Sequence, residues 1–188
     1  FHRCVNLGDI VYDVGGHVGY YSVLCSKLTG PTGKVLVFEP RPLNSSYIRH
    51  HIKINDIKNI CLFDAAVSNK SGEAGFESRT GTGTGHLSGK GNLNVKTIVL
   101  DEFVFGESHH LPDFLKIDIE GGEVNALNGA KKLLTQVRPK LLVATHGKKE
   151  SSFVLHLLEQ NKYEYEILNP DAIKGDTEIL AFPRKEKE

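Results

Sequence analysis

The chain has 188 residues and carries 23 basic and 23 acidic side chains, so its formal charge at pH 7 is zero. This balance argues against nucleic acid or another polyanion as a partner held by bulk charge. Apolar residues make up 39% and charged residues 24%, which is a globular composition, and the length predicts one domain over residues 1–188. The composition leaves the oligomeric state open.

Cysteine usage and hydropathy bear on the compartment. Cys4, Cys25 and Cys61 are odd in number and form no CxxC pair, so we expect free thiols in a reducing compartment, the cytoplasm. The longest apolar runs are far too short to cross a bilayer, and we expect neither a membrane span nor a signal peptide. Because the chain starts at Phe1, contains no Met and enters its first predicted strand at Ile10, we expect N-terminal elements to be missing.

The first part of the chain alternates short β-branched runs with longer amphipathic stretches. This alternation is typical of a parallel sheet with crossover helices. In chain order we predict a strand at 10–14, a helix at 18–28, a strand at 35–38, a helix from Asn44 or Ser45 to about 54, and a strand at 60–67. The turn residues Gly30-Pro31-Thr32-Gly33 end the first helix.

The alternation breaks between residues 68 and 100. Residues 68–72 have the composition of a turn, residues 81–91 are too rich in glycine for a regular element, and residues 95–99 alternate like a partly exposed strand. We therefore predict that 68–100 is an inserted β-hairpin with a mobile tip.

The last part of the chain returns to the alternating pattern. We predict a strand at 114–118, a helix carrying Val124, Leu127, Ala130 and Leu134, a strand at 141–144, a helix around 153–158, and strands at 163–168 and 178–182. The final two strands lie close in sequence and are expected to form an antiparallel pair. The charged tail at 185–188 is expected to be frayed.

The segment Asp13–Gly19 lies at the turn from the first strand into the first helix, where an α/β sheet binds its cofactor. Its glycines miss the GxGxxG spacing of a dinucleotide site in both frames. A carboxylate just before the turn would repel a pyrophosphate, whereas it suits a ligand with a cationic end. The alternative is a tight turn whose glycines only allow close packing.

Two further acids follow the next strands. Glu39 ends the second strand after an apolar run, where a carboxylate can accept hydrogen bonds from the two hydroxyls of a ribose. Asp64, followed by Ala65, lies at the end of the third strand in the same crevice, where it could meet an adenine amino group. The alternatives are a solvated strand end for Glu39 and a turn cap for Asp64.

Four motifs resemble the FkbM family of class I S-adenosylmethionine-dependent methyltransferases. They are Val11-Tyr12-Asp13-Val14-Gly15, Val18-Gly19-Tyr20-Tyr21-Ser22, Phe38-Glu39-Pro40 and Lys116-Ile117-Asp118-Ile119-Glu120-Gly121-Gly122-Glu123. The similarity extends from about Gly8 to Phe182. It implies a Rossmann-like, mostly parallel sheet of seven strands with its last strand antiparallel, helices on both faces, and methyl transfer from S-adenosylmethionine, typically to a hydroxyl oxygen.

The resemblance also implies roles for single residues. Asp13, Gly15 and Gly19 would hold the methionyl end of the cofactor, Glu39 the ribose, and Asp64 with Ala65 the adenine. The same motifs bring Gly16, His17 and Pro40 into the predicted cofactor site.

The chain departs from the family pattern at two places. Gly16-His17 stands where Ala-Asn is usual, and Ala144 stands where a Glu often precedes the following histidine by two residues. A carboxylate that would orient His146 is therefore missing from its usual position.

Three residues at the predicted carboxyl ends of central strands are candidates for catalysis: Asp118, Glu120 and His146. Methyl transfer to a hydroxyl needs in-line alignment and removal of a proton, and any of the three could take that proton. The alternatives are a buried ion pair of Asp118 with Lys116, a helix N-terminal acid at Glu120, and simple exposure of His146. We predict no metal site, because the paired histidines at 50–51 and 109–110 lack further ligands.

The predicted function is S-adenosylmethionine-dependent O-methylation of a small molecule, sugar or glycolipid, with acceptor specificity in residues 68–100 and in the segment before the first strand. The alternative is a non-catalytic module that binds S-adenosylmethionine or a nucleotide on the same fold. A P-loop hydrolase is excluded, because Gly85–Gly91 has the wrong glycine spacing and no Ser or Thr follows Lys90.

Overall fold

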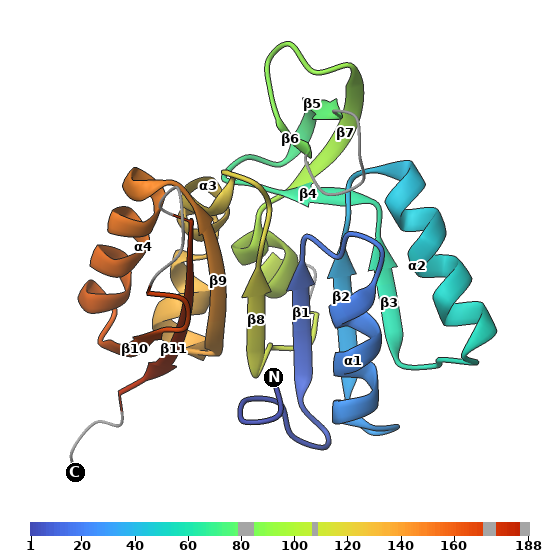
Figure 1. Cartoon of the computed structure of the whole chain (residues 1–188), viewed down its shortest axis with the longest axis horizontal. Coiled ribbons are helices and arrows are strands. Elements are labelled where there is room, and N and C mark those ends of the chain that lie inside the picture. Colours follow the sequence, from blue (N-terminus) through green and yellow to red (C-terminus); the bar gives the residue numbers. More distant parts are fainter. Residues whose placement is uncertain (79–84, 107–108, 171–175, 185–188) are drawn as a thin grey trace.

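A seven-stranded sheet forms the centre of the protein (Figure 1). The computed structural model describes residues 1–78, 85–106, 109–170 and 176–184. The strand order is β10-β11-β9-β8-β1-β2-β3, and β11 alone runs against its neighbours β9 and β10. The strands are β1 (Ile10–Val14), β2 (Lys34–Phe38), β3 (Ile60–Phe63), β8 (Phe114–Ile117), β9 (Lys140–His146), β10 (Tyr163–Ile167) and β11 (Asp176–Pro183). This confirms the predicted mostly parallel sheet with its last strand antiparallel.

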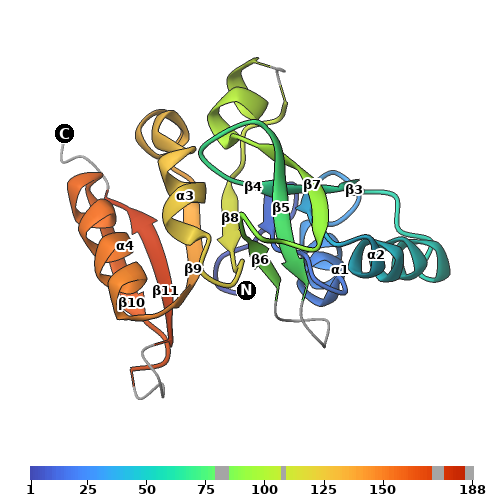
Figure 2. The ribbon, with the colours of Figure 1, turned by 90° about the horizontal axis from the view of Figure 1, so that it is seen from above.

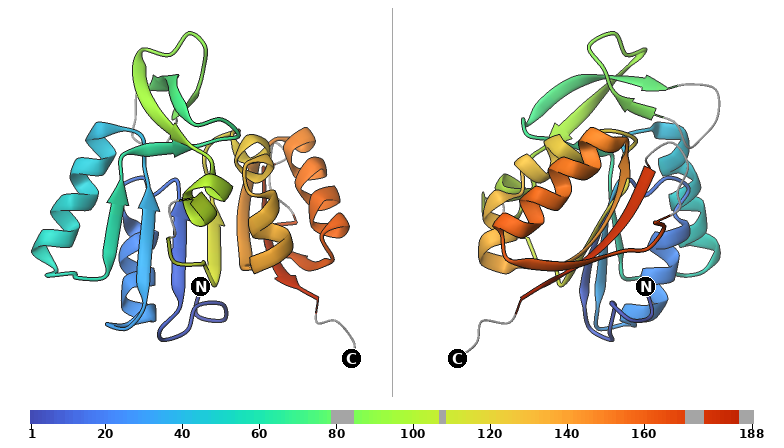
Figure 3. Two further views of the ribbon diagram at one scale, coloured as in Figure 1. Left: turned by 180° about the vertical axis from the view of Figure 1, so that it is seen from behind. Right: turned by 60° about the vertical axis from the view of Figure 1, so that its left-hand side comes forward.

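Helices cover both faces of this sheet (Figure 3, right view). They are α1 (Tyr20–Thr29), α2 (Pro42–Ile54), α3 (Glu123–Asn128) and α4 (Lys148–Gln160), with π-helical turns η1 (Glu102–Gly106) and η2 (Leu133–Val137). Alternate residues of β1 divide between the two layers: Val11 packs in one cluster with Cys25 of α1, and Tyr12 packs in the other with Leu158 of α4. The period of two in the strands therefore produces two separate apolar layers.

Two helix predictions need correction. The second helix begins at Pro42 with Arg41 as its N-cap, so neither Asn44 nor Ser45 caps it. Proline is well suited to the first turn of a helix because it needs no hydrogen-bond partner for a backbone N–H. The predicted helix through Leu134 is broken into α3 and the π-helical turn η2.

The predicted single strand at 60–67 is two strands in two different sheets. Ile60–Phe63 (β3) pairs with β2, whereas Ala65–Val67 (β4) pairs in parallel with β7 (Leu93–Ile98). The chain changes partner at Asp64, which lies between the two strands. The apolar run at 60–67 is interrupted only by Asp64, and a single polar residue does not show that a strand changes its neighbour, so the sequence pattern did not locate this break.

The segment after β4 builds a second, four-stranded sheet in the order β4-β7-β5-β6. It stands above the carboxyl ends of the central strands, and Figure 2 shows it from above. β5 (Gly72–Ser78) is antiparallel to both β7 and β6 (Gly85–Leu87). The hairpin predicted within 68–100 is thus part of a larger sheet.

Regular structure extends into the glycine-rich stretch. Gly85–Leu87 is a strand, so the expectation that 81–91 has no regular element is wrong for that part, while 81–84 and the tail at 185–188 lie outside the described residues. The glycines serve close backbone packing: a Cβ on Gly75 would lie 2.4 Å from the carbonyl oxygen of Ser88, and one on Gly91 would lie 2.2 Å from the backbone nitrogen of Phe76.

Two further expectations concern thiols and membranes. Cys4, Cys25 and Cys61 are all free, and the first two are buried. Within the described part of the chain, no helix combines the length and apolar character that a membrane span requires.

Candidate active site

A cavity of about 230 Å³ lies between the carboxyl edge of the central sheet and the second sheet. Its floor comes from the β1–α1 turn, the end of β2 and the segment after β8. Its roof comes from the second sheet, and the roof residues are Ala66, Val67, Phe76, Gly85, His86 and Leu87. The cavity therefore lies where open α/β sheets bind their ligands.

The β1–α1 turn lies directly against the chain that leaves β8. Gly15 has a φ of +84°, and a Cβ there would be 1.9 Å from the carbonyl oxygen of Asp118. A Cβ on Gly16 would be 2.3 Å from a methyl carbon of Val37. Gly19, with a φ of +92°, is the N-cap of α1. Close contacts thus require glycine at positions 15 and 16. Gly15 brings the β1–α1 turn against the segment after β8, and both form part of the cavity floor.

Asp13 is buried beneath this turn and does not line the cavity. One carboxylate oxygen accepts a hydrogen bond from Lys116 Nζ at 2.9 Å, and the other accepts one from the Ser22 hydroxyl at 2.6 Å. Lys116 also donates to the carbonyl oxygen of Gly15 at 2.9 Å. Burial alone would lower the pKa of Lys116, but Asp13 and Asp118 outweigh it and raise that pKa. Asp13 therefore fixes the turn through Lys116.

The predicted ion pair of Lys116 with Asp118 is present but secondary. Lys116 Nζ lies 3.9 Å from Asp118 Oδ2, one ångström farther than from Asp13. The ammonium group is almost fully buried, whereas the Asp118 side chain is 37% exposed. The carboxylate of Asp118 thus reaches from the buried pair toward the cavity.

Glu39 presents a buried carboxylate at the tip of β2. Oε2 accepts a hydrogen bond from the backbone N–H of His17 at 2.9 Å, and Oε1 accepts bonds from the Arg41 N–H and the Asn44 side chain at 2.9 and 3.3 Å. Burial raises the pKa of Glu39, and these donors partly offset the rise. A carboxylate has about four acceptor positions, so Glu39 can still accept from a ligand hydroxyl.

His17 and Pro40 line the cavity together with Glu39. His17 has a left-handed backbone with a φ of +50°. Its Nε2 atom is buried and has no hydrogen-bond partner. Burial and the nearby Lys116 lower the pKa of this imidazole, so it is neutral at pH 7. A polar ligand in the cavity would satisfy this nitrogen.

The predicted adenine contacts lie outside the cavity lining. Asp64 forms an exposed ion pair with Arg49, and this contact outweighs partial burial to lower the pKa of Asp64. Ala65 is buried in β4, and the next two residues, Ala66 and Val67, line the cavity in its place. The structure therefore brings Gly15, His17, Glu39 and Pro40 to the cavity wall, whereas Asp13, Gly16, Gly19, Asp64 and Ala65 are not part of the lining.

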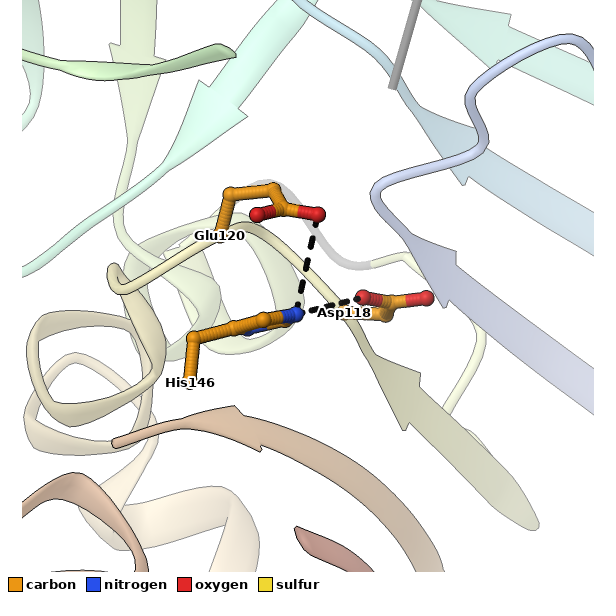
Figure 4. A group of neighbouring side chains, drawn as sticks. All are labelled: Asp118, Glu120 and His146. Carbon is orange, nitrogen blue, oxygen red and sulfur yellow. Dashed lines mark ion pairs between the residues drawn. The ribbon is translucent and has the colours of Figure 1, made fainter. Parts of the chain in front are cut away.

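The three predicted catalytic residues converge where β8 and β9 end, which we call the β8–β9 end of the cavity, although His146 itself is not part of the lining (Figure 4). Nε2 of His146, at the end of β9, lies 3.8 Å from Oδ1 of Asp118 and 3.6 Å from Oε1 of Glu120. Asp118 and Glu120 both line the cavity. Glu120 has a left-handed backbone with a φ of +55°, which is unusual for a residue other than glycine. Such strain is often found at functional sites.

Glu123 is a site residue that the sequence analysis did not identify. It is fully buried, and its Oε1 accepts hydrogen bonds from the N–H groups of Ile119 and Gly121 and lies 3.1 Å from His146 Nδ1. Glu123 thus supplies the orienting carboxylate that Ala144 lacks. The signal was its position at the end of the 116–123 motif, but its approach to a residue of β9 depends on the fold.

These acids control the protonation of His146. Hydrogen bonding to Glu123, with the charges of Glu120 and Asp118, raises the pKa of His146 to about 9 against the opposing effect of burial. Burial raises the pKa of Glu120, and His146 partly offsets that rise. Burial would raise the pKa of Glu123 as well, but the bonds from His146 and Gly121 lower it. At neutral pH an imidazolium therefore lies among three carboxyl groups.

The strand order and the cavity at the carboxyl edge of β1 and β2 define the Rossmann-like methyltransferase class. The sequence profile of the methyltransferase FkbM domain matches residues 13–167, and the chain belongs to that family. It is similar to the hexuronic acid methyltransferase AglP of Haloferax volcanii, with 29% identity over 167 residues, which cover 87% of this chain and 67% of the relative.

Solved structures share the fold. The methyltransferase FkbM from Methylobacillus flagellatus superposes with a TM-score of 0.68 at 16% identity, covering 97% of this chain and 49% of the other, so the chain spans about half of that protein. SMU.1697c from Streptococcus mutans, a methyltransferase solved in complex with S-adenosylhomocysteine, has a TM-score of 0.63 at 13% identity and covers 96% and 92% of the two chains.

Proposed function

We propose that the chain transfers a methyl group from S-adenosylmethionine to a hydroxyl oxygen of a sugar-type acceptor. The observation that carries this proposal is one cavity with two different ends. One end has the glycine turn and Glu39, and the other has Asp118 and Glu120. Membership of the FkbM family and the similarity to a hexuronic acid methyltransferase support the reaction and the acceptor class.

The residues at the β1–β2 end fit the cofactor. Glu39 has about one free acceptor position for a ribose hydroxyl, the unpartnered Nε2 of His17 can bond a polar group, and Gly15 leaves the turn without a side chain. Ala66 and Val67 give the adenine an apolar wall, and Asp64 would need to leave Arg49 to reach it. When bound, S-adenosylmethionine supplies an activated methyl group whose bond to sulfur breaks with the electron pair remaining on sulfur.

The residues at the β8–β9 end are suited to hold the acceptor and take its proton. As the acceptor oxygen forms its bond to the methyl carbon, its proton must leave. The raised pKa of His146 keeps the imidazole protonated at neutral pH, so Asp118 or Glu120 is the proton acceptor in the metal-free site. Alignment of the two ligands in one cavity supplies most of the rate enhancement, because alignment contributes about 7–11 kcal/mol in favourable cases.

The test uses binding and transfer on the same protein. Calorimetry should show binding of S-adenosylhomocysteine and none of NAD, and labelled S-adenosylmethionine should methylate uronic acids or neutral sugars. Binding of NAD alone would refute the cofactor proposal. Binding of S-adenosylhomocysteine without transfer to any member of a panel of sugars, glycolipids and small alcohols would favour the non-catalytic module.

We propose a cytoplasmic location, with which the three free thiols are compatible. Labelled protein in fractionated cells tests it: recovery with a membrane fraction or outside the cell would contradict it.

A further inference from the structure

Asp118, Glu120 and His146 each offer one potential ligand atom, and these three atoms lie within 4.8 Å of one another (Figure 4). We propose that they bind a divalent cation of the Mg²⁺ or Mn²⁺ type, which holds the acceptor hydroxyl. The cation site stands on its own geometry, and the role of the hydroxyl rests on the proposed function.

Both separations measured from His146 Nε2 fit a common ion. Two ligands about 2.1 Å from one cation are about 3.0 Å apart at a right angle and about 4.2 Å apart when they lie opposite each other. His146 Nε2 is 3.8 Å from Asp118 Oδ1 and 3.6 Å from Glu120 Oε1, within that range. Two carboxylate oxygens favour Mg²⁺ and Mn²⁺, and one imidazole nitrogen shifts the preference toward Mn²⁺.

Glu123 gives independent support from behind the imidazole. Metal-binding histidines usually donate their second ring N–H to a carboxylate, which fixes the ring and directs the other nitrogen to the metal. Glu123 takes this position, 3.1 Å from His146 Nδ1, and two backbone N–H groups hold its carboxylate in place. Glu123 is fully buried, and its Oε2 has no hydrogen-bond partner. His146 Nε2 is thereby aimed at the two cavity-lining carboxylates. A cation bound there would displace the Nε2 proton of the imidazolium to solvent, while Nδ1–H stays bonded to Glu123.

The neighbouring charges leave room for a cation. Lys116 is a basic group close to Asp118, but its Nζ approaches Oδ2, whereas Oδ1 faces His146. Lys116 is also neutralised by Asp13. The side chains of Asp118, Glu120 and His146 are 37%, 38% and 25% exposed, so water and an acceptor can complete the coordination.

A cation here would activate the acceptor. A hydroxyl bound to a divalent cation loses its proton more readily, because the cation stabilises the oxyanion. The proton goes to water, the oxygen forms the new bond to the methyl carbon, and the electron pair of the broken carbon–sulfur bond stays on sulfur. The cation is unchanged, and no side chain need act as a base.

The test is a Mn²⁺ titration of the chelator-treated 188-residue chain, followed by electron paramagnetic resonance and without cofactor or acceptor. We expect one Mn²⁺ per chain. Glu120→Gln and His146→Gln should each weaken binding at least about tenfold, and Glu123→Gln, which removes the outer carboxylate, about 10- to 100-fold. Asp176→Asn is the matched control, because Asp176 pairs with His146 in register, adds negative charge nearby and is not a ligand.

Two results would overturn the cation site: no bound Mn²⁺ at millimolar concentration, or equal binding by the control and the ligand variants. Circular dichroism of each variant tests whether the variant is folded. Glu120→Gln alone decides the matter if the others do not fold, because Glu120 is 38% exposed and Glu123 and Asp118 remain beside His146 in this variant.

A parallel titration with S-adenosylhomocysteine separates this inference from the proposed function. If the chain binds S-adenosylhomocysteine but does not bind Mn²⁺, the cation site is refuted and the proposed function stands. If it binds Mn²⁺ but binds neither S-adenosylhomocysteine nor NAD, the proposed cofactor is refuted and the cation site stands. Methyl transfer that survives complete chelation would overturn the role of the cation in holding the hydroxyl.

Discussion

The two ends of the cavity are built in different ways. At the β1–β2 end, Glu39 is 5% exposed, and backbone N–H groups of two nearby residues fix its carboxylate. At the β8–β9 end, Asp118, Glu120 and His146 are a quarter to two fifths exposed, and His146 Nε2 lies 3.6 Å or more from both carboxylates. The first end is closed around its own hydrogen bonds, and the second leaves its charged groups open.

This difference matches the two ligands that we propose. A cofactor that is the same in every turnover is best held by groups fixed in advance, because little ordering is then lost on binding. An acceptor and a cation need open coordination positions and charged groups that can adjust. Both ends share one rigid foundation, since Lys116 links Asp13 under the turn to Asp118.

Removal of the shared foundation should have the largest effect. Lys116→Met leaves the buried carboxylate of Asp13 with the Ser22 hydroxyl as its remaining side-chain partner among the described residues, and breaking a buried pair costs about 3–5 kcal/mol of stability. Urea unfolding measures it. The double variant with Asp13→Leu should recover part of the loss, because no buried charge then remains unpaired. Unchanged stability of Lys116→Met would show that the two ends are not coupled through this pair.

Gly15→Ala should have the next largest effect. The added Cβ would clash with the carbonyl oxygen of Asp118 and must adopt a φ of +84°, which together should cost about 2–4 kcal/mol. Gly121→Ala is the matched control: its φ is +99° but nothing lies within 4 Å of the added Cβ, so only strain of about 1 kcal/mol is expected. Equal thermal shifts for the two variants would contradict the close contact between the turn and β8.

Glu39→Gln tests the β1–β2 end by itself. The loss of a charge-assisted bond of about 1.5–3 kcal/mol should weaken binding of S-adenosylhomocysteine about 10- to 100-fold in calorimetry. Asp64→Asn should change the affinity less than twofold, because the Asp64 side chain of the unsubstituted protein is paired with Arg49 and does not contact the cofactor site. A larger loss in Asp64→Asn than in Glu39→Gln would instead support the adenine contact expected from the family resemblance.

The same contrast explains what the sequence could predict. The positions of the central strands, Gly15 and Glu39 follow from local features, because a strand, a tight turn and an acid at a strand tip are each contained in a few consecutive residues. Glu123 and the partner change at Asp64 depend on residues that meet only in the fold: Glu123 reaches β9, and β4 pairs with β7. Asp13 was identified by position, but its burial with Lys116 required the register of β1 against β8.

The smallest effect concerns the backbone at the β8–β9 end. Glu120 has a φ of +55°, a conformation that costs a residue with a Cβ about 1–2 kcal/mol and glycine almost nothing. Glu120→Gly and Glu120→Ala both remove the carboxylate, so the difference between them isolates the strain. After the larger chain entropy of glycine is deducted, Glu120→Gly should be more stable by about 0.5–1 kcal/mol in urea unfolding. Alanine as stable as glycine would mean that the turn carries no strain. The exposed side chains would then be the feature that distinguishes this end, because the backbone that holds Glu120 near His146 would be unstrained even when no ligand is bound.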